Sequence, residues 1–301
     1  MAYLGELLAL GTAVFWAFGS ILFSYAGRRV GAFTVNAVRI PIAATVLLGL
    51  TVLIQQEFFS PSTTGSQFGW LAFSAFLGLV IGDGCHFRAL VILGPRIASL
   101  LAASTPIFAV LLSWVVLDQS LSWIHLVGIV ITLSGLGWVT LERNANTFGE
   151  EKGGSKIWGY ILAGIGAMGQ ATGLIAAKIG MQENLTPLSA SLIRMVSAAV
   201  MIWIIAVGQG KVRETITGLR DRKARLAMLA AAFIGPVFGI WMSLVSIKLT
   251  KVGIAATLMS TTPLWIIPLV MIVHGERPSP RAIIGTIITV GGVALLFLPD
   301  V

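Results

Sequence analysis

An apolar stretch that occurs twice decides the fold: RIASLLAASTPIFAVLLSWVVL at residues 96–117 and VGIAATLMSTTPLWIIPLVMIVH at residues 252–274. Each copy has the length of about 20 residues that an α-helix needs to cross the hydrocarbon core of a bilayer. A transmembrane β-barrel would instead show segments of roughly ten residues with alternating polarity. The two stretches therefore predict membrane-spanning helices.

The composition of the whole chain agrees with that class. Apolar residues make up 56% of the 301 positions, while Asp, Glu, Lys and Arg together make up 11%. A soluble domain carries about a quarter charged residues. We interpret the net charge of +8 as basic residues in cytoplasmic loops and expect no nucleic-acid partner. The single cysteine, Cys85, excludes an intrachain disulfide and a cysteine-based metal site.

Ten apolar runs follow one another along the chain. The predicted spans are 4–26, 32–54, 69–92, 96–117, 123–141, 157–179, 187–208, 226–248, 252–274 and 281–298. A polar linker at 145–156 separates a first five-helix repeat, 1–144, from a second, 157–301. We therefore predict an all-α integral membrane protein with ten transmembrane helices.

The two halves match in register at a constant offset of 157 residues. Thr105-Pro106 falls on Thr262-Pro263. Further matched pairs are Gly78 and Gly235, Gly82 and Gly239, Gly128 and Gly285, Thr132 and Thr289, and Gly135 and Gly292. Because five is an odd number, the second half must start on the opposite side of the membrane. The sequence thus predicts inverted repeats, from which many secondary transporters are built around a midplane solute site.

Basic residues in the predicted loops indicate the orientation. Loops after odd-numbered spans hold Arg28, Arg29, Arg96, Arg143, Lys152, Lys156, Lys211, Arg213, Arg220, Arg222, Lys223, Arg225, Arg277 and Arg281. Loops after even-numbered spans hold only Lys178, Lys248 and Lys251. Since positive charge accumulates in cytoplasmic loops, both chain termini are expected outside.

The segment GDGCHFRAL at 82–90, followed by Gly94-Pro95 and Ser104-Thr105-Pro106, resembles the third and fourth helices of EamA-type transporters of the drug/metabolite transporter superfamily. The second half resembles the same pattern at Thr262-Pro263 and Gly275-Glu276. The first half departs from it, with Asp118-Gln119 in place of the family's Gly-Glu. The resemblance covers nearly the whole chain. It implies a carrier in the plasma (inner) membrane of a bacterium or an archaeon, commonly an exporter of metabolites or amino acids. The resemblance also implies that both termini lie in the cytoplasm. The loop charges predict the opposite, and we keep the orientation that they indicate.

Asp83 is the only carboxylate deep within a predicted span, and His86 lies three residues on, on the same helix face. A charge near the bilayer centre costs at least about 2.5–3.5 kcal/mol, so it needs a partner or a wet cavity. Our functional hypothesis makes the two a titratable pair at the central cavity, which relays protons or binds a cationic group. The alternative is a buried pair that only ties two helices together.

Arg39 and Arg194 occupy equivalent places in the two halves. Together they could hold a carboxylate or phosphate, because guanidinium groups bind such anions bidentately. The alternative is snorkelling to lipid headgroups, or hydrogen bonding to exposed carbonyls at a helix end. Thr105 and Thr262 each precede a proline, which frees a backbone carbonyl one turn back. The freed carbonyl either serves as a solute ligand or only marks a kink. Three further candidates lie within spans, where they line a cavity or simply pack: Trp16, Gln170 and Trp241.

Phosphate-binding loops, His-Glu-x-x-His sites and serine-nucleophile elbows do not occur in the sequence. We therefore expect no enzyme, no ATP-driven pump, no cofactor and no metal site. The leading prediction is a secondary active transporter that exports a small metabolite, such as an amino acid, by alternating access at a midplane site. We expect a monomer or a homodimer, and the proton is the candidate coupling ion. The alternative is a lipid flippase or a membrane-embedded enzyme.

Overall fold

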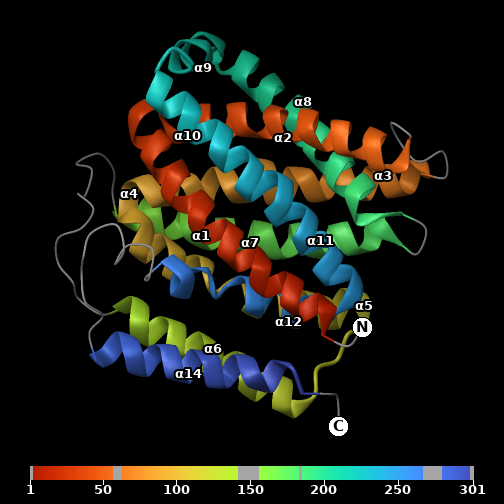
Figure 1. The fold of residues 1–301 in the computed structure, drawn as a ribbon, viewed down its shortest axis with the longest axis vertical. Coiled ribbons are helices and arrows are strands. Elements are labelled where there is room, and N and C mark those ends of the chain that lie inside the picture. Colours follow the sequence, from red (N-terminus) through yellow and green to blue (C-terminus); the bar gives the residue numbers. More distant parts are fainter. Residues whose placement is uncertain (1–2, 57–62, 142–155, 183–184, 267–279, 299–301) are drawn as a thin grey trace.

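The computed structural model describes residues 3–56, 63–141, 156–182, 185–266 and 280–298, and within these ranges it contains helices and no strands (Figure 1). In chain order the helices are α1 (Leu4–Val30), α2 (Ala32–Gln55), α3 (Gly65–Ala75), η1 (Phe76–Gly82), α4 (Asp83–Ala102), α5 (Thr105–Leu117), α6 (Trp123–Leu141), α7 (Lys156–Met181), α8 (Pro187–Gly208), α9 (Val212–Gly218), α10 (Arg222–Ala232), η2 (Phe233–Gly239), α11 (Ile240–Leu249), α12 (Val252–Met259) and α14 (Pro280–Leu296). The segments η1 and η2 are π-helical and join their neighbours into single long helices.

Six helices of the described chain are long and apolar enough to cross a bilayer, and four shorter apolar helices accompany them. The outer faces of the helices are also apolar: Trp114, Trp123 and Ile287 are each more than 60% exposed. A water-soluble protein rarely exposes so much apolar surface in one place. In a bilayer these side chains contact lipid. The chain is a multi-pass membrane protein.

Two predicted boundaries differ from the structure. The break expected at Gly94-Pro95 is wrong, because α4 continues to Ala102 and the helix is interrupted at residues 103–104. A membrane helix tolerates a proline when neighbouring groups satisfy the freed backbone. The charged loop at 211–225 also contains a short helix, α9. The linker at 145–155 and the Gly275-Glu276 motif lie outside the described residues.

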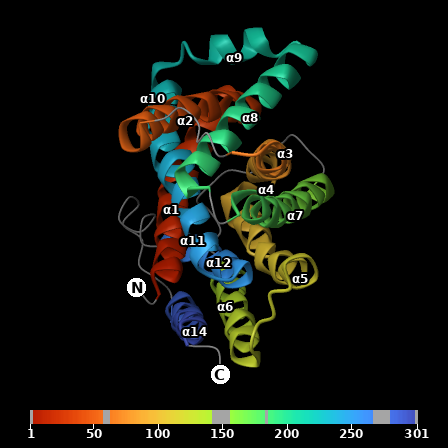
Figure 2. The same cartoon turned by 90° about the vertical axis from the view of Figure 1, so that its right-hand side faces the viewer.

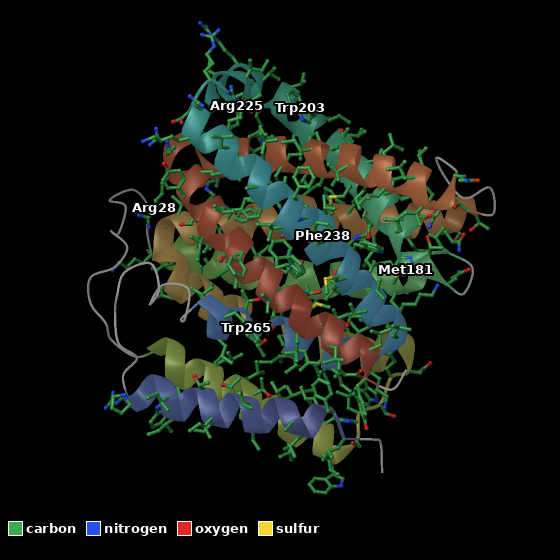
Figure 3. The ribbon with its side chains drawn as sticks, viewed as in Figure 1. Arg28, Met181, Trp203, Arg225, Phe238 and Trp265 are labelled. Atoms are coloured by element: carbon green, nitrogen blue, oxygen red, sulfur yellow. The ribbon has the colours of Figure 1, made fainter. Side chains whose placement is uncertain are left out.

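Helices of the two halves pack against each other in exchanged pairs. α6 packs against α14, and α2 packs against α8. The long helix α10–η2–α11 packs against α1, while α3–η1–α4 packs against α7 (Figures 1 and 2). Both chain termini lie at one end of the helices. Arg28, in the last turn of α1, and Arg225, in the first turn of α10, lie away from the termini, as Figure 3 shows.

The two π-helical segments occupy equivalent positions, since 76–82 plus 157 gives 233–239. Each contains both of the glycines that the repeat places in register. The wider π turn leaves backbone carbonyls without their ordinary helical partners, and such turns occur frequently at functional sites. The fold therefore distorts the third helix of each half at equivalent positions of the repeat.

Pro41 lies inside α2 and cannot donate the hydrogen bond that would satisfy the Ala37 carbonyl. The Trp203 indole of α8 donates to that carbonyl instead, at 3.0 Å. An unsatisfied buried carbonyl would cost about 1–3 kcal/mol. The tryptophan thus links the equivalent second helices of the two halves at the proline.

Replacing Trp203 with phenylalanine keeps a large apolar ring but removes this donor. We expect the free energy of unfolding to fall by about 1–3 kcal/mol, measured by denaturant unfolding in detergent. Trp241→Phe is the matched control, because Trp241 packs against the same apolar cluster. An equal loss in both variants would contradict a specific role for the Trp203 hydrogen bond.

Candidate functional site

The carboxylate of Asp83 is buried at the point where η1 passes into α4. It forms an ion pair with Arg39 of α2, and it accepts a hydrogen bond from the Gln170 amide of α7. Its partners therefore come from two other helices, one in each half of the chain. We call Asp83, Arg39, Gln170 and Arg194 the Asp83 cluster.

Arg39 is fully buried, and its guanidinium group has polar and aromatic contacts. Its Nε donates to Asn36 Oδ1 at 2.8 Å. The guanidinium carbon lies 5.1 Å from the ring centre of Phe23 and 4.7 Å from that of Phe87, within the range of cation–π attraction. Arg39 Nη1 has no hydrogen-bond partner among the described residues. Burial rules out the snorkelling alternative for this arginine.

Carbonyls of the π-helical segment η1 help to hold the cluster. Gln170 donates to Gly78 O at 3.1 Å, and Asn36 donates to Leu79 O at 3.2 Å. The approach of α7 is very close, because a Cβ on Gly169 would lie 2.7 Å from Leu77 O. Gly173 lies equally close, with 2.9 Å between its added Cβ and Gly78 Cα, so the two small residues allow α7 to pack closely against η1.

Arg194, the repeat counterpart of Arg39, is 3% exposed and therefore also does not snorkel. A Cβ on Gly78 would lie 3.3 Å from Arg194 Nη2, so this guanidinium also points toward η1. It forms no ion pair with a described carboxylate, and its Nε has no hydrogen-bond partner within the described chain. The repeat explains this difference: the offset of 157 places Ile240 where the second half would need an aspartate.

His86 is partly buried in α4, and its backbone lies against Gly166 of α7. Among the described side chains, no hydrogen bond joins His86 to Asp83. Trp16 of α1 lies beside η2, where a Cβ on Gly239 would be 3.3 Å from the indole nitrogen. Trp241 packs against the apolar cluster between α2 and α8. The structure thus places both tryptophans near the second half's π-helical region.

The threonines of the two Thr-Pro motifs bond to their own chain. Thr105 Oγ1 donates to Ala102 O at 2.7 Å, and Thr262 Oγ1 donates to Met259 O at 2.8 Å. These bonds cap the helix ends at equivalent positions in the two halves. No described hydrogen bond links either threonine to the Asp83 cluster. The kink alternative accounts for both contacts.

Sequence reasoning missed Asn36, Phe23 and Phe87 as supports of Arg39. The spacing of Asn36, three residues before Arg39, is a signal that could have identified it, because such residues share a helix face. The two phenylalanines lie on other helices. Nothing in an apolar sequence distinguishes them from lipid-facing aromatic residues.

Comparison with known proteins agrees with this architecture. The model of the EamA-like transporter family matches residues 3–141 and 157–298. The chain belongs to this family. An uncharacterized transporter of Archaeoglobus fulgidus is 23% identical over 306 residues, which cover 97% of this chain and 98% of that protein. A crystal structure of a protein with 18% identity covers 98% of this chain and 96% of that one with a TM-score of 0.72, which indicates a shared fold.

Membership of the EamA-like family confirms the resemblance that the sequence motifs carried, and EamA is part of the drug/metabolite transporter superfamily. The family and the archaeal relative both indicate a membrane transporter rather than an enzyme. A transporter of this family binds small-molecule solutes and lies in the lipid bilayer.

Proposed function

We propose that this EamA-family protein is a secondary active transporter that exports a small metabolite, such as an amino acid, through the Asp83 cluster. The observation that carries the proposal is the charge balance of that cluster. Two buried guanidinium groups, Arg39 and Arg194, face one carboxylate, Asp83. Among the residues that the structure describes, one positive charge is thus left without an ionic partner. A solute carboxylate would balance it, and each arginine has one buried nitrogen without a described acceptor, Nη1 in Arg39 and Nε in Arg194.

Alternating access would follow from two inverted repeats of five helices, 1–144 and 157–301, joined by a linker at 145–156. The exchanged helix pairs and the equivalent π-helical segments support this arrangement. In such transporters the solute site lies near the midplane, where the two repeats meet. The Asp83 cluster fits that position, since Asp83 and Arg39 come from the first repeat and Gln170 and Arg194 from the second.

The proposed membrane is the plasma (inner) membrane of a bacterium or an archaeon, with both termini outside. The gathering of Arg28 and Arg225 away from the termini supports this orientation. The proposed coupling ion is the proton, taken up by Asp83 with His86 nearby. Trp16, Trp241, Thr105 and Thr262 remain predicted solute contacts, and a monomer and a homodimer are both compatible with the proposal.

Asp83→Asn tests both the solute site and the coupling. Purified protein in proteoliposomes is assayed with a panel of labelled amino acids and related metabolites. We expect the wild type to accumulate at least one of them in response to a pH gradient. The variant should lose the pH dependence but retain solute exchange, because asparagine cannot release a proton.

Two outcomes would contradict the proposal. Wild-type vesicles without flux of any panel member would exclude amino acids and similar metabolites as solutes. A variant with full pH-dependent accumulation would exclude Asp83 as the proton site. Gln170→Glu serves as a matched variant, because it adds a carboxylate to the same cluster and should make the pH dependence steeper.

A further inference from the structure

Arg39 and Arg194 occupy equivalent places in the two repeats, but their surroundings differ. An offset of 155 residues pairs the two arginines and also matches Ala43-Ala44 with Ala198-Ala199. Three matched pairs have different side chains: Asn36 and Ser191, Ile42 and Ser197, and, at the offset of 157 residues, Asp83 and Ile240. The second repeat thus lacks the amide and the carboxylate that bind Arg39 in the first.

The side chains that replace these two partners do not take over their contacts. Ser191 Oγ donates to Pro187 O of its own helix at 2.8 Å. Ile240 is buried, and its side chain has no polar atom. It belongs to an apolar cluster with residues of α8, and α11 packs against α8 as α4 packs against α2. The second repeat therefore presents an arginine in the same setting without an internal carboxylate.

Two polar side chains of α8 lack partners at this place. Arg194 Nε and Ser197 Oγ are both buried, and neither has a hydrogen-bond partner among the described residues. Because the two residues are three positions apart, their side chains are neighbours on one face of the helix. A buried polar group without a partner is costly, so two such groups side by side indicate a site that a ligand completes. The hydroxyl is specific to the second repeat, since the first has Ile42 there.

The charges indicate a ligand group with a single negative charge. Asp83 is the only carboxylate of the chain inside a predicted span, and it is paired with Arg39. The seven carboxylates that lie outside the described residues are also outside the predicted spans: Glu57, Glu142, Glu150, Glu151, Glu183, Glu276 and Asp300. A solute carboxylate would balance Arg194. A phosphate group, with a charge of about −1.5 to −2, would leave an excess of negative charge.

We propose that Arg194 and Ser197 form the subsite for the carboxylate of the solute, which takes the role in the second repeat that Asp83 has in the first. This inference rests on the proposed function and adds to it the class of solute, one that carries a carboxylate and not a phosphate. The guanidinium group would bind the carboxylate bidentately, and the Ser197 hydroxyl would donate to it.

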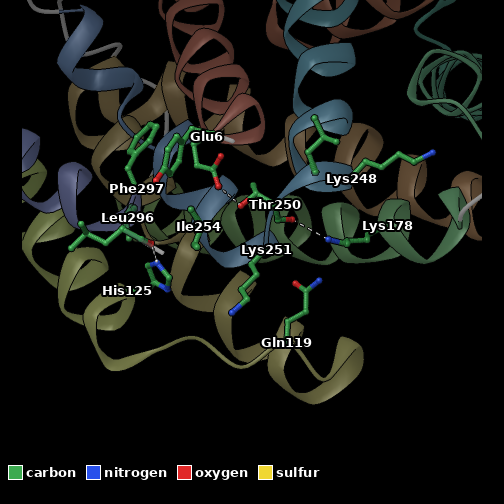
Figure 4. Close-up of a pocket in the computed structure, with 13 residues that line it drawn as sticks. Glu6, Gln119, His125, Lys178, Lys248, Thr250, Lys251, Ile254, Leu296 and Phe297 are labelled. Carbon is green, nitrogen blue, oxygen red and sulfur yellow. Dashed lines mark hydrogen bonds between the residues drawn. The ribbon is translucent and has the colours of Figure 1, made fainter. Parts of the chain in front are cut away.

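A separate pocket supplies a control for this subsite. It has a volume of about 380 Å³ and opens at the end of the molecule where both termini lie (Figure 4). Lys178 lines it and donates to Thr250 O at 3.0 Å, whereas neither Arg194 nor Ser197 belongs to its lining. Lys178→Gln therefore removes a positive charge near solute-accessible surface without touching the proposed subsite.

The first experiment gives the second repeat its own carboxylate. Ile240→Asp places an aspartate at the position equivalent to Asp83, where it should pair with Arg194. We expect this variant to melt within about 5 °C of the wild type, and Arg194→Met/Ile240→Asp to melt at least about 10 °C lower, because its aspartate is buried without a partner. Thermal unfolding of the purified full-length protein in detergent measures both, with Arg194→Met alone as the remaining variant of the cycle.

The second experiment measures binding by the rise in melting temperature. The probes are amino acids and simple monocarboxylates, each tested beside its carboxamide, which lacks the negative charge. We expect at least one carboxylate, and not its carboxamide, to stabilise the wild type and Lys178→Gln. The apparent affinity should fall about tenfold or more in Ser197→Ala, which loses one charge-assisted hydrogen bond. Ile240→Asp should not respond, because its own carboxylate binds Arg194, whereas the neutral isostere Ile240→Asn should.

The subsite is overturned if Ile240→Asp melts at the same temperature with and without Arg194. It is also overturned if no carboxylate stabilises the wild type, or if Ser197→Ala and Ile240→Asp bind carboxylates as the wild type does. Neither experiment measures flux. A protein that binds carboxylates at Arg194 and Ser197 without transporting them would contradict the proposed function alone, and transport with unchanged affinity in both variants would contradict the subsite alone.

Discussion

Replacing Arg39 with methionine is expected to lower the free energy of unfolding by about 3–5 kcal/mol, because Asp83 would then be buried without its ionic partner. The double variant Arg39→Met/Asp83→Asn should recover much of that loss, since an amide is far cheaper to bury than a carboxylate. Denaturant unfolding in detergent measures both. Equal losses in the single and double variants would contradict the importance of the pair.

Arg194→Met is the matched comparison, because Arg194 occupies the equivalent place in the other repeat. It forms no ion pair with a described carboxylate. Its replacement should therefore cost little stability, while solute transport is lost if Arg194 holds the solute anion. We therefore expect Arg39 to support the fold and Arg194 to support transport. A severe loss of stability in Arg194→Met would contradict this division.

Gly135→Ala and Gly292→Ala are each expected to destabilise the protein by about 3 kcal/mol, at the upper end of the range for overpacking. A Cβ on Gly135 would lie 2.6 Å from Thr289 N, and one on Gly292 would lie 2.5 Å from Thr132 N. These atoms belong to the backbone of the opposite helix. They can move only if α6 and α14 separate.

Neighbouring glycines provide the controls. A Cβ on Gly137 of α6 or on Gly291 of α14 would meet nothing within 4 Å. Alanine at those positions should be neutral or stabilise by up to about 1 kcal/mol, because alanine favours helix more than glycine does. Thermal unfolding of the four single variants tests the packing. Similar melting temperatures for Gly135→Ala and Gly137→Ala would refute the close crossing.

Much of the helical architecture could be predicted from the sequence. Apolar runs of sufficient length indicate membrane helices, and the repeat identified the glycines that lie at the crossings of α6 with α14 and of α7 with η1. The Thr105-Pro106 motif predicted a kink next to the break at 103–104, but the boundary between the two helices was placed wrongly at Gly94-Pro95, which has a stronger breaker composition. At the break the structure depends on hydroxyl caps at Ser104 and Thr105, which bond to Leu101 O and Ala102 O.

The site was only partly predictable for a related reason. The cost of burying Asp83 indicated that it needs a partner, but helix periodicity shows which residues share a face and not which helix lies opposite. Arg39 is 44 residues away from Asp83 in sequence, and Gln170 is 87 residues away. The π-helical segments also have no distinct composition, although their carbonyls bind two of the side chains that hold the cluster.

The two halves have different residues directly after their π-helical segments, and this difference has an energetic consequence. In a carrier made of identical inverted halves, the inward-open and outward-open states would be related by a two-fold rotation and would be equal in free energy. This chain has Asp83 in one half and Ile240 in the other. In the proposed alternating-access carrier, the two facing states of the empty protein are therefore expected to differ in free energy, and a solute shifts their populations by as much as its affinity for the two states differs.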